Sequence, residues 1–350
     1  QRALDDKLTI TARLSATLEE NNYVKYDNGS DPKNAIYQAM RRSPTDPVND
    51  ASGGFFETDR NFQYNNPVAM IDQFTNTRDA KRYLANFDLN YDFTDHLSAK
   101  VTTAIGRDDQ QSWYAEPASA FSNTTNGLAN REYKNKRYNY VSEILSYTNT
   151  FKDRHSINLL GGHSWQNMYE EGFKAEVRNI DPFYEDVAAD NLKAYSELEW
   201  GYSTSFRNTP EGLASFFSRA IYDFDKKYYT TLSLRRDKST KYGDDIEWGT
   251  FWAVSGAWNI NKEAFMKNIN RVSDLRLRVG YGLTGNADIP NNIDRVRYQP
   301  TSKGIDSETG QEIIIWNNNS GNIANPNLAW EEVRELNIGI DFGFLKNRIT

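Results

Sequence analysis

Residues 81–105 read KRYLANFDLNYDFTDHLSAKVTTAI, and they carry the clearest secondary-structure pattern in the chain. Apolar and aromatic side chains occupy every second position across 83–93, and polar side chains lie between them at Asn86, Asp88, Asn90 and Asp92. The short polar stretch 94–96 follows, and a second alternating run covers 97–105. A strict period of two is typical of a β-strand with one apolar and one polar face. The stretch therefore predicts an amphipathic hairpin.

The same period of two recurs along the chain. The opening run 8–18 alternates as regularly as the hairpin. Further strands are expected at 137–151, 155–165, 215–225, 227–237, 250–260, 272–283 and 332–344. The pattern is clear at 272–283, where the shared apolar face carries Leu275, Leu277, Val279 and Tyr281. If the other face were turned toward lipid, Arg276 and Arg278 would contact the bilayer. Each arginine would then destabilise the fold by about 2–4 kcal/mol near the midplane, so the register is well specified.

The lengths of the connections indicate which kind of β protein this is. Short links join neighbouring strands into hairpins, and long polar segments separate the hairpins at roughly 20–80, 106–136, 166–214 and 284–331. Outer-membrane barrels place tight turns at the periplasmic end and long loops outside. A soluble β-sandwich has no reason to separate loop lengths in this way. The sequence therefore favours an all-β fold, an antiparallel transmembrane β-barrel with long extracellular loops.

Composition is compatible with this fold and excludes other classes. The 350 residues carry a net charge of −7, which makes nucleic acid an unsuitable partner. Cysteine is absent, so disulfides and thiolate metal sites are excluded. No apolar run approaches the length of a membrane-spanning helix. A mean hydropathy of −0.78 still suits strands in which only every second residue is apolar.

One short helix is expected in the first long segment. Residues 35–42 suit a helix, which Asp31 would cap and in which Pro32 would occupy the first turn. The proline-containing stretch 43–47 would end it.

Motifs for catalysis or cofactor binding are weak. GYGLTG at 280–285 matches G-x-G-x-x-G, but a nucleotide site needs a helix to begin there, and none is expected. Adjacent carboxylates on a strand point to opposite faces, which makes them poor acid–base pairs. The three histidines, His96, His155 and His163, have no partners at metal-ligand spacing. We therefore expect no catalytic residues, no metal and no cofactor.

Aromatic residues in the long polar segments are the candidate ligand contacts. Aromatic faces stack on sugars and on peptide side chains, although such residues also staple loops together. The candidates are Trp113, Tyr114, Trp200, Tyr202 and Trp316.

Several stretches carry a family resemblance. They read LSLRRD at 232–237, LRLR at 275–278, YGLTGN at 281–286 and NPNLAWE at 325–331. In this order and at this spacing they resemble the SusC/RagA family of TonB-dependent outer-membrane transporters, over nearly the whole chain. Lys238, Ser239 and Thr240 stand where the family usually has a glycine and two serines.

The resemblance implies nutrient uptake across a bacterial outer membrane, surrounded by outer-membrane lipid. Energy would come through TonB acting on the missing N-terminal region, and a SusD-like surface lipoprotein would help to capture oligosaccharide or peptide cargo. The implied domain is 1–350 as part of a single barrel of about 22 strands, with the plug domain and the C-terminal strands absent. We therefore expect the first and last strands to lack a partner within the chain, or to pair with segments outside this sequence, so residues 8–18 should not pair with residues 332–344. The alternatives are a soluble or surface glycan-binding β-sheet protein and a secreted glycoside hydrolase.

Overall fold

The fold is known from a computed structural model of the chain. It describes residues 2–3, 6–24, 34–57, 65–118, 127–180, 192, 201–208, 210–242, 248–267, 269, 271–289, 298–318, 325, 328–345 and 348.

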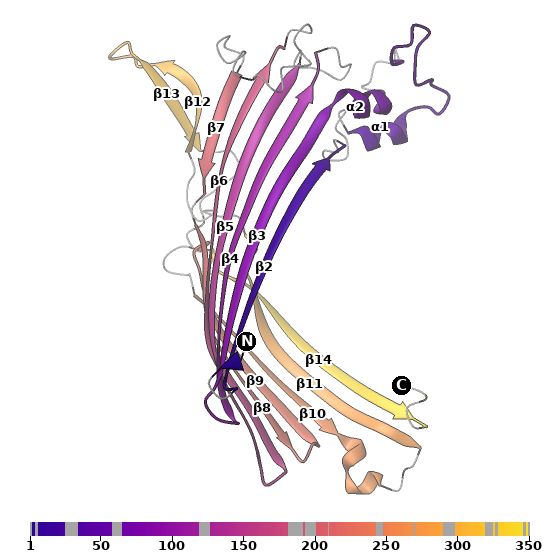
Figure 1. The fold of residues 1–350 in the computed structure, drawn as a ribbon, viewed down its shortest axis with the longest axis vertical. Helices are drawn as coiled ribbons and strands as arrows, with labels where there is room; N and C mark the ends of the chain where they lie inside the picture. Colours follow the sequence, from indigo (N-terminus) through magenta and orange to yellow (C-terminus); the bar gives the residue numbers. More distant parts are fainter. Residues whose placement is uncertain are drawn as a thin grey trace.

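A single antiparallel sheet dominates the structure (Figure 1). Its strands follow the order β1-β2-β3-β4-β5-β6-β8-β9-β10-β11-β14, and β7 pairs with the far part of β6. Their bounds are β1 Arg2–Ala3, β2 Leu8–Asn22, β3 Thr75–Asp92, β4 Leu97–Glu116, β5 Leu128–Phe151, β6 His155–Arg178, β7 Gly201–Arg207, β8 Glu211–Phe224, β9 Tyr228–Ser239, β10 Trp248–Asn259, β11 Val272–Asn286 and β14 Glu331–Phe344. The sheet curves strongly and confirms the all-β antiparallel fold.

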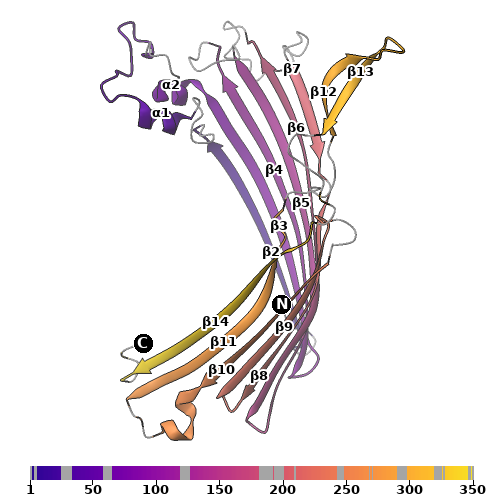
Figure 2. The same ribbon diagram turned by 180° about the vertical axis from the view of Figure 1, so that it is seen from behind.

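The sheet does not close on itself. At one edge β2 pairs with β3 and with the two-residue β1, and at the other edge β14 pairs with β11. Figure 2 shows β2 and β14 at opposite edges of the curved surface. The expectation that residues 8–18 and 332–344 do not pair with each other is confirmed. The chain therefore forms part of a barrel wall, with two open edges.

Tight connections gather at one end of the sheet, which we call the tight-turn end. Residues 93–96 join β3 to β4, as predicted. Lys152 and Asp153 between β5 and β6, and Asp225 and Lys226 between β8 and β9, all have φ between 52° and 58°. This left-handed conformation is rare outside short turns. All these turns lie at the bottom of Figure 1.

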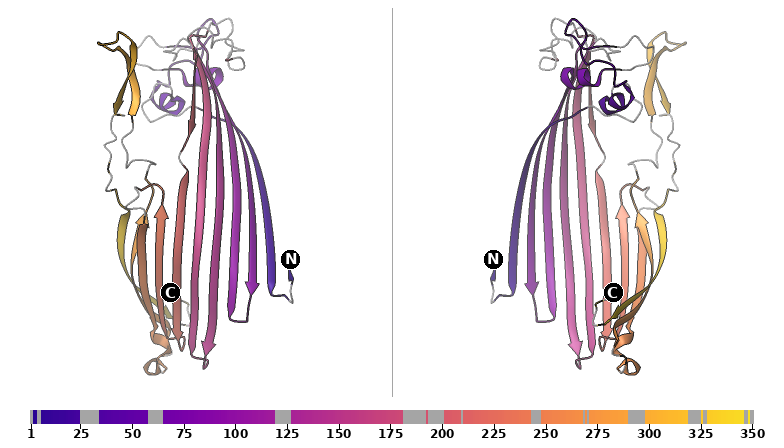
Figure 3. Two further views of the ribbon diagram at one scale, coloured as in Figure 1. Left: turned by 90° about the vertical axis from the view of Figure 1, so that its left-hand side faces the viewer. Right: turned by 90° about the vertical axis from the view of Figure 1, so that its right-hand side faces the viewer.

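Several strands are much longer than predicted. β5 and β6 each have 24 residues, whereas β9 and β10 have 12. Figure 3 shows β2–β6 rising well beyond β8–β11 and β14 at the end opposite the tight turns. The interpretation of 106–136 and 166–214 as loops was therefore wrong for most of these residues. Polar residues there lack the apolar alternation, but the strands continue because ladder hydrogen bonds and cross-strand ion pairs such as Lys136–Glu170 hold them.

Two short helices lie beside the far ends of β2 and β3 (Figure 1). α1 spans Ala35–Arg41, close to the predicted range. Its N-cap is Asn34, whose side chain accepts from Tyr37 N at 3.0 Å, so the choice of Asp31 as the cap was wrong. Asp31 and Pro32 lie outside the described residues. α2 spans Pro67–Gln73 with Asn66 as the N-cap, and it was not predicted.

A separate hairpin occupies part of the expected loop 284–331. β12 (Tyr298–Ile305) pairs with β13 (Glu312–Asn318), and Figure 1 shows the hairpin apart from the main sheet. Two 3₁₀ turns, Ile260–Lys262 and Ala264–Met266, follow β10.

Candidate functional site

The main sheet has two chemically different faces. On the apolar face, large side chains are open to solvent, including Leu14 (86% exposed) and Ile338 (65%). On the polar face, residues at the same heights are buried, including Asp88, Ala104, Ser142, Ser215 and Asn259. Side chains on the concave side of a curved sheet converge and shield one another. The polar face is therefore the inner, concave wall, and the apolar face points outward.

Two rows of aromatic rings border the apolar face. The lower aromatic row, near the tight turns, contains Tyr91, Phe93, Tyr147, Phe224, Tyr228, Trp258 and Phe342. The upper aromatic row contains Tyr83, Trp165, Phe216, Trp248 and Tyr281. At 3.3 Å per residue and a strand tilt near 40°, the rows lie about 20–25 Å apart across a membrane. This spacing matches the apolar band of outer-membrane barrels.

One hydrogen-bonded pair of polar side chains interrupts the apolar face between the rows. His163 Nδ1 lies 3.0 Å from Glu143 Oε2, and the imidazole also packs on Phe216 with ring centroids 4.8 Å apart. An isolated carboxylate is costly away from water, and a close partner lowers that cost. The pair therefore makes this departure from the apolar pattern tolerable.

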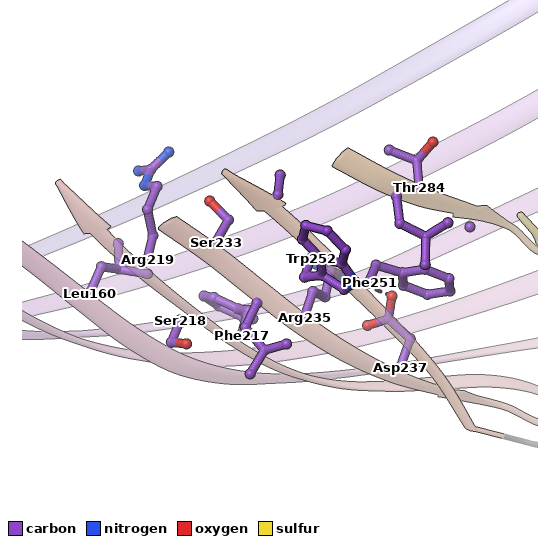
Figure 4. Close-up of a pocket in the computed structure, with 14 residues that line it drawn as sticks. Leu160, Phe217, Ser218, Arg219, Ser233, Arg235, Asp237, Phe251, Trp252 and Thr284 are labelled. Carbon is purple, nitrogen blue, oxygen red and sulfur yellow. Dashed lines mark hydrogen bonds and ion pairs between the residues drawn. The ribbon is translucent and has the colours of Figure 1, made fainter. Parts of the chain in front are cut away.

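The polar face carries a pocket of about 490 Å³ (Figure 4). Five neighbouring strands supply its wall, so the site depends on the register of β6, β8, β9, β10 and β11. Its polar-face lining includes Phe217, Arg219, Ser233, Arg235, Asp237, Phe251, Ala253 and Thr284. Aromatic, cationic and anionic groups thus share one hollow, and such a mixture can hold a polar ligand with apolar patches.

Arg235 organises the pocket. Its Nε donates to Asp237 Oδ2 at 2.8 Å, and an Nη donates to Ser215 Oγ at 2.8 Å. The guanidinium also lies 5.8 Å from the centroid of the Phe217 ring. These contacts fix the guanidinium plane, yet 45% of the side chain stays exposed. Arg235 can therefore still donate to a ligand.

The rest of the polar face is a lattice of ion pairs. Asp88 accepts from Arg13 at 2.7 Å and from Thr102 Oγ1 at 2.7 Å, and Lys100 Nζ lies 3.5 Å away. Arg278 forms a two-pronged pair with Asp341 at 2.8 and 2.6 Å. Arg82 bridges Glu19 and Asp108. These groups line a wet interior, and they do so without one dominant sign of charge.

An aromatic cluster closes the far side of the pocket. The Phe251 ring meets Trp330 edge-on at 5.3 Å, and Tyr242 lies 4.9 Å from the same indole. A Cβ added at Gly285 or Gly249 would overlap the Phe251 ring. The GYGLTG stretch at 280–285 therefore lies within β11 and makes room for packing. A strand, not a nucleotide-binding helix, is confirmed here.

The predicted ligand contacts are spread over three elements. Trp113 and Tyr114 lie in β4, where adjacent residues face opposite sides; Arg131 stacks over Trp113 at 5.8 Å, and Tyr114 Oη donates to Glu116 at 3.2 Å. Tyr202 in β7 lies under Arg178 at 5.9 Å. Trp316 in β13 is exposed. Trp200 lies outside the described residues. Their role as ligand contacts stays a prediction.

Sequence reasoning did not select the pocket residues. The signal was available, because Arg235 and Asp237 fall on the polar side of the alternation in 227–237. Among residues that the structure describes, no group of three His, Cys, Asp or Glu side chains could hold a metal ion.

Within the described ranges, the helices are too short or too polar to cross a membrane.

Comparison with known proteins identifies the family. The family described as "TonB dependent receptor-like, beta-barrel" matches residues 15–350. The chain belongs to the TonB-dependent receptor family. Members of this family are outer-membrane receptors, and the predicted resemblance to SusC and RagA is confirmed.

The TonB-dependent receptors most useful for comparison are distant in sequence. The chain is 28% identical to TonB-dependent receptor P3 of Formosa agariphila over 92% of its length and 31% of that protein. It is 28% identical to TonB-dependent receptor SusC of Bacteroides thetaiotaomicron over 95% of its length and 35% of that protein. The chain thus spans about a third of the length of these curated relatives.

A solved structure supports the same fold. The structure of the RagAB peptide transporter matches 99% of the chain and 38% of the matched chain, with a TM-score of 0.77 and 19% identity. At this identity the likeness shows the fold of this TonB-dependent receptor barrel, and the fold alone.

Proposed function

We propose that the chain is a barrel-wall segment of a SusC-like transporter that imports a nutrient across the outer membrane. The observation that carries the proposal is the two-faced curved sheet. Its outward face is apolar between two aromatic rows, and its inward face is a lattice of charged and polar groups. Lipid suits the first face and a water-filled passage suits the second.

The proposal includes a longer polypeptide than the chain itself. Two open sheet edges are not tolerated within a bilayer, so further strands must pair with β2 and β14. A plug domain inside the completed barrel would couple to TonB and to the energy of the inner membrane. A SusD-like surface lipoprotein would sit over the long strand ends and help to retain cargo.

The cargo in this proposal is an oligosaccharide, with a peptide as the second candidate. The pocket on the polar face combines the Phe217 ring with the donors of Arg219 and Arg235, and rings beside charged donors suit sugar faces and hydroxyl groups. The name of the relative SusC does not mention a cargo, whereas RagAB is described as a peptide transporter. Both cargo classes therefore enter the test.

The experiment uses the full-length protein in its native host or in a reconstituted outer membrane. Uptake of labelled maltooligosaccharides and of labelled peptides is measured with and without TonB. Arg235→Gln should lower uptake of the true cargo at least about fivefold, since it removes a charge-assisted donor from the pocket. Arg236→Gln, the neighbouring residue on the outward face, is the matched control. TonB-independent uptake, or a wild-type protein that stays soluble without detergent, would contradict the proposal.

The aromatic residues selected from the sequence extend the proposal. We include Trp113, Tyr114, Trp200, Tyr202 and Trp316 as cargo contacts. Each is replaced by Ala in the full-length protein, and cargo affinity is measured by calorimetry. Weakened binding in at least one variant is expected, and unchanged affinity in all five would remove them from the proposed path.

A soluble glycan-binding protein is less well supported. Val279 and Tyr281 on the outward face stay 43% and 39% exposed, and in the described part of the chain no second layer covers them. A soluble sheet would have to bury such a face.

A further inference from the structure

Four side chains form a row across the outward face where its apolar band ends. Register pairs Tyr83 of β3 with Arg107 of β4, Arg107 with Arg137 of β5, and Arg137 with Tyr169 of β6. Below this row on β4 lies Ile105, which is 65% exposed. Tyrosine beside arginine at the edge of an apolar band is typical of the headgroup layer of a membrane.

A groove of about 600 Å³ opens at this row. Three arginines, Arg107, Arg137 and Arg207, line it together with Tyr169, and the Asn139 and Asn208 side chains complete the polar part of the wall. We call this hollow the arginine groove.

An apolar trough continues from the arginine groove toward the middle of the band. This second hollow has a volume of about 480 Å³, and Leu14, Ala16, Ala85 and Ile105 line it on the outward face. Both hollows share the segment from Ile105 to Arg107. A cationic mouth therefore opens directly onto an apolar channel along the wall.

The charges in the groove leave donors available. Arg107 binds Asp109 at 2.6 and 3.1 Å, and Glu171 is shared by Arg137 at 3.2 Å and Arg207 at 3.1 Å. Two carboxylates thus serve three guanidinium groups. Lys81 lies opposite Asp109 in the register and adds a further positive charge. Arg207 keeps 82% of its side chain exposed, so the groove has a positive excess that faces outward.

We infer that the arginine groove binds the phosphate of a membrane lipid, with an acyl chain lying in the apolar trough. Guanidinium groups hold phosphate through paired, charge-assisted hydrogen bonds. The trough explains why the phosphate is lipid-borne, because a free anion would gain nothing from Leu14 or Ile105. The inference rests on the proposed membrane placement of the outward face and goes beyond the transport function.

The test titrates detergent-solubilised full-length protein with dioleoyl phosphatidic acid and follows bound lipid by native mass spectrometry. Dioleoylglycerol, which lacks the phosphate, is titrated in parallel. The wild type should prefer phosphatidic acid, and the double variant R137Q/R207Q should lose affinity for it at least about tenfold. R131Q removes the same charge from the same face, higher on β5, and should keep the preference.

Two results would overturn the inference. One is an unchanged lipid preference in R137Q/R207Q, and the other is displacement of phosphatidic acid by an equal concentration of inorganic phosphate. Heat-modifiable gel mobility reports whether the double variant has folded. If it has not, the same lipid titration is carried out with the single variant R207Q, whose residue lies on the exposed strand β7. Failure of the transport proposal is separate, since it would show as absent TonB-dependent uptake by the wild type.

Discussion

Leu232→Arg is the sharpest test of which face meets lipid. Leu232 lies on the outward face of β9, roughly midway between Tyr228 in the lower aromatic row and the residues beside the upper row. It pairs with Ala220 and Val254 and is 51% exposed. An arginine near the midplane of a bilayer costs about 2–4 kcal/mol in a barrel. The ratio of folded to unfolded protein should fall by a factor of about thirty to several hundred.

Thr231→Arg is the matched control. Thr231 is the adjacent residue on the same strand, and its side chain points to the polar face opposite Ser255. Water solvates an arginine there, so we expect less than about 1 kcal/mol of destabilisation. The assay is equilibrium unfolding of full-length protein in phosphatidylcholine vesicles, read by tryptophan fluorescence and gel mobility. Equal destabilisation by both substitutions, or the reverse order, would refute the assignment of the faces.

Three other perturbations follow from described contacts. Gly285→Ala should destabilise by about 1–3 kcal/mol, because its methyl group would displace the Phe251 ring, whereas Gly161→Ala, with no atom within 4 Å of the added Cβ, should be near neutral in the same unfolding assay. Asp88→Asn removes the charge that Arg13 and Lys100 share and should cost about 1 kcal/mol, more than the exposed Asp92→Asn does. Burial raises the pKa of Glu57 from 4.5 to about 7, so the folded state binds this proton more tightly than the unfolded state does. The segment that contains α1 and α2 should therefore become less stable as the pH rises from about 4.5 to about 7. Hydrogen exchange measures this, and constant protection over that pH range would contradict the prediction.

The sequence predicted the parts of the fold that lipid imposes. In β11 the alternation of Leu275, Leu277, Val279 and Tyr281 with Arg276 and Arg278 set the register that the structure confirms. Such residues have only one acceptable side, so their pattern is strict.

The sequence did not predict the parts of the strands that water surrounds. In β4 after Ile105 and in β5 before Arg137, both faces carry polar side chains. The sequence there has no period of two and therefore predicts loops instead of strands. Their pairing depends on contacts between distant segments, such as Arg82 with Asp108. α2 was missed for a related reason, since a seven-residue helix carries too few apolar positions to show its period.

The candidate site was only partly predictable. Alternation places Arg235 and Asp237 on the inner wall, but the pocket is lined by five strands, and no local sequence pattern reveals how these strands are staggered. The sequence selects the candidate aromatic residues by their polar surroundings, and the structure separates the described ones over β4, β7 and β13.

The unequal strand lengths give the wall a slanted rim. β5 and β6 contain twice as many residues as β9 and β10, and they extend farther from the tight-turn end (Figure 3). A ligand that approaches over β9 and β10 therefore passes a shorter length of strand before it reaches the polar face than one that approaches over β5 and β6. Ligands should accordingly enter more readily on the side of the shorter strands.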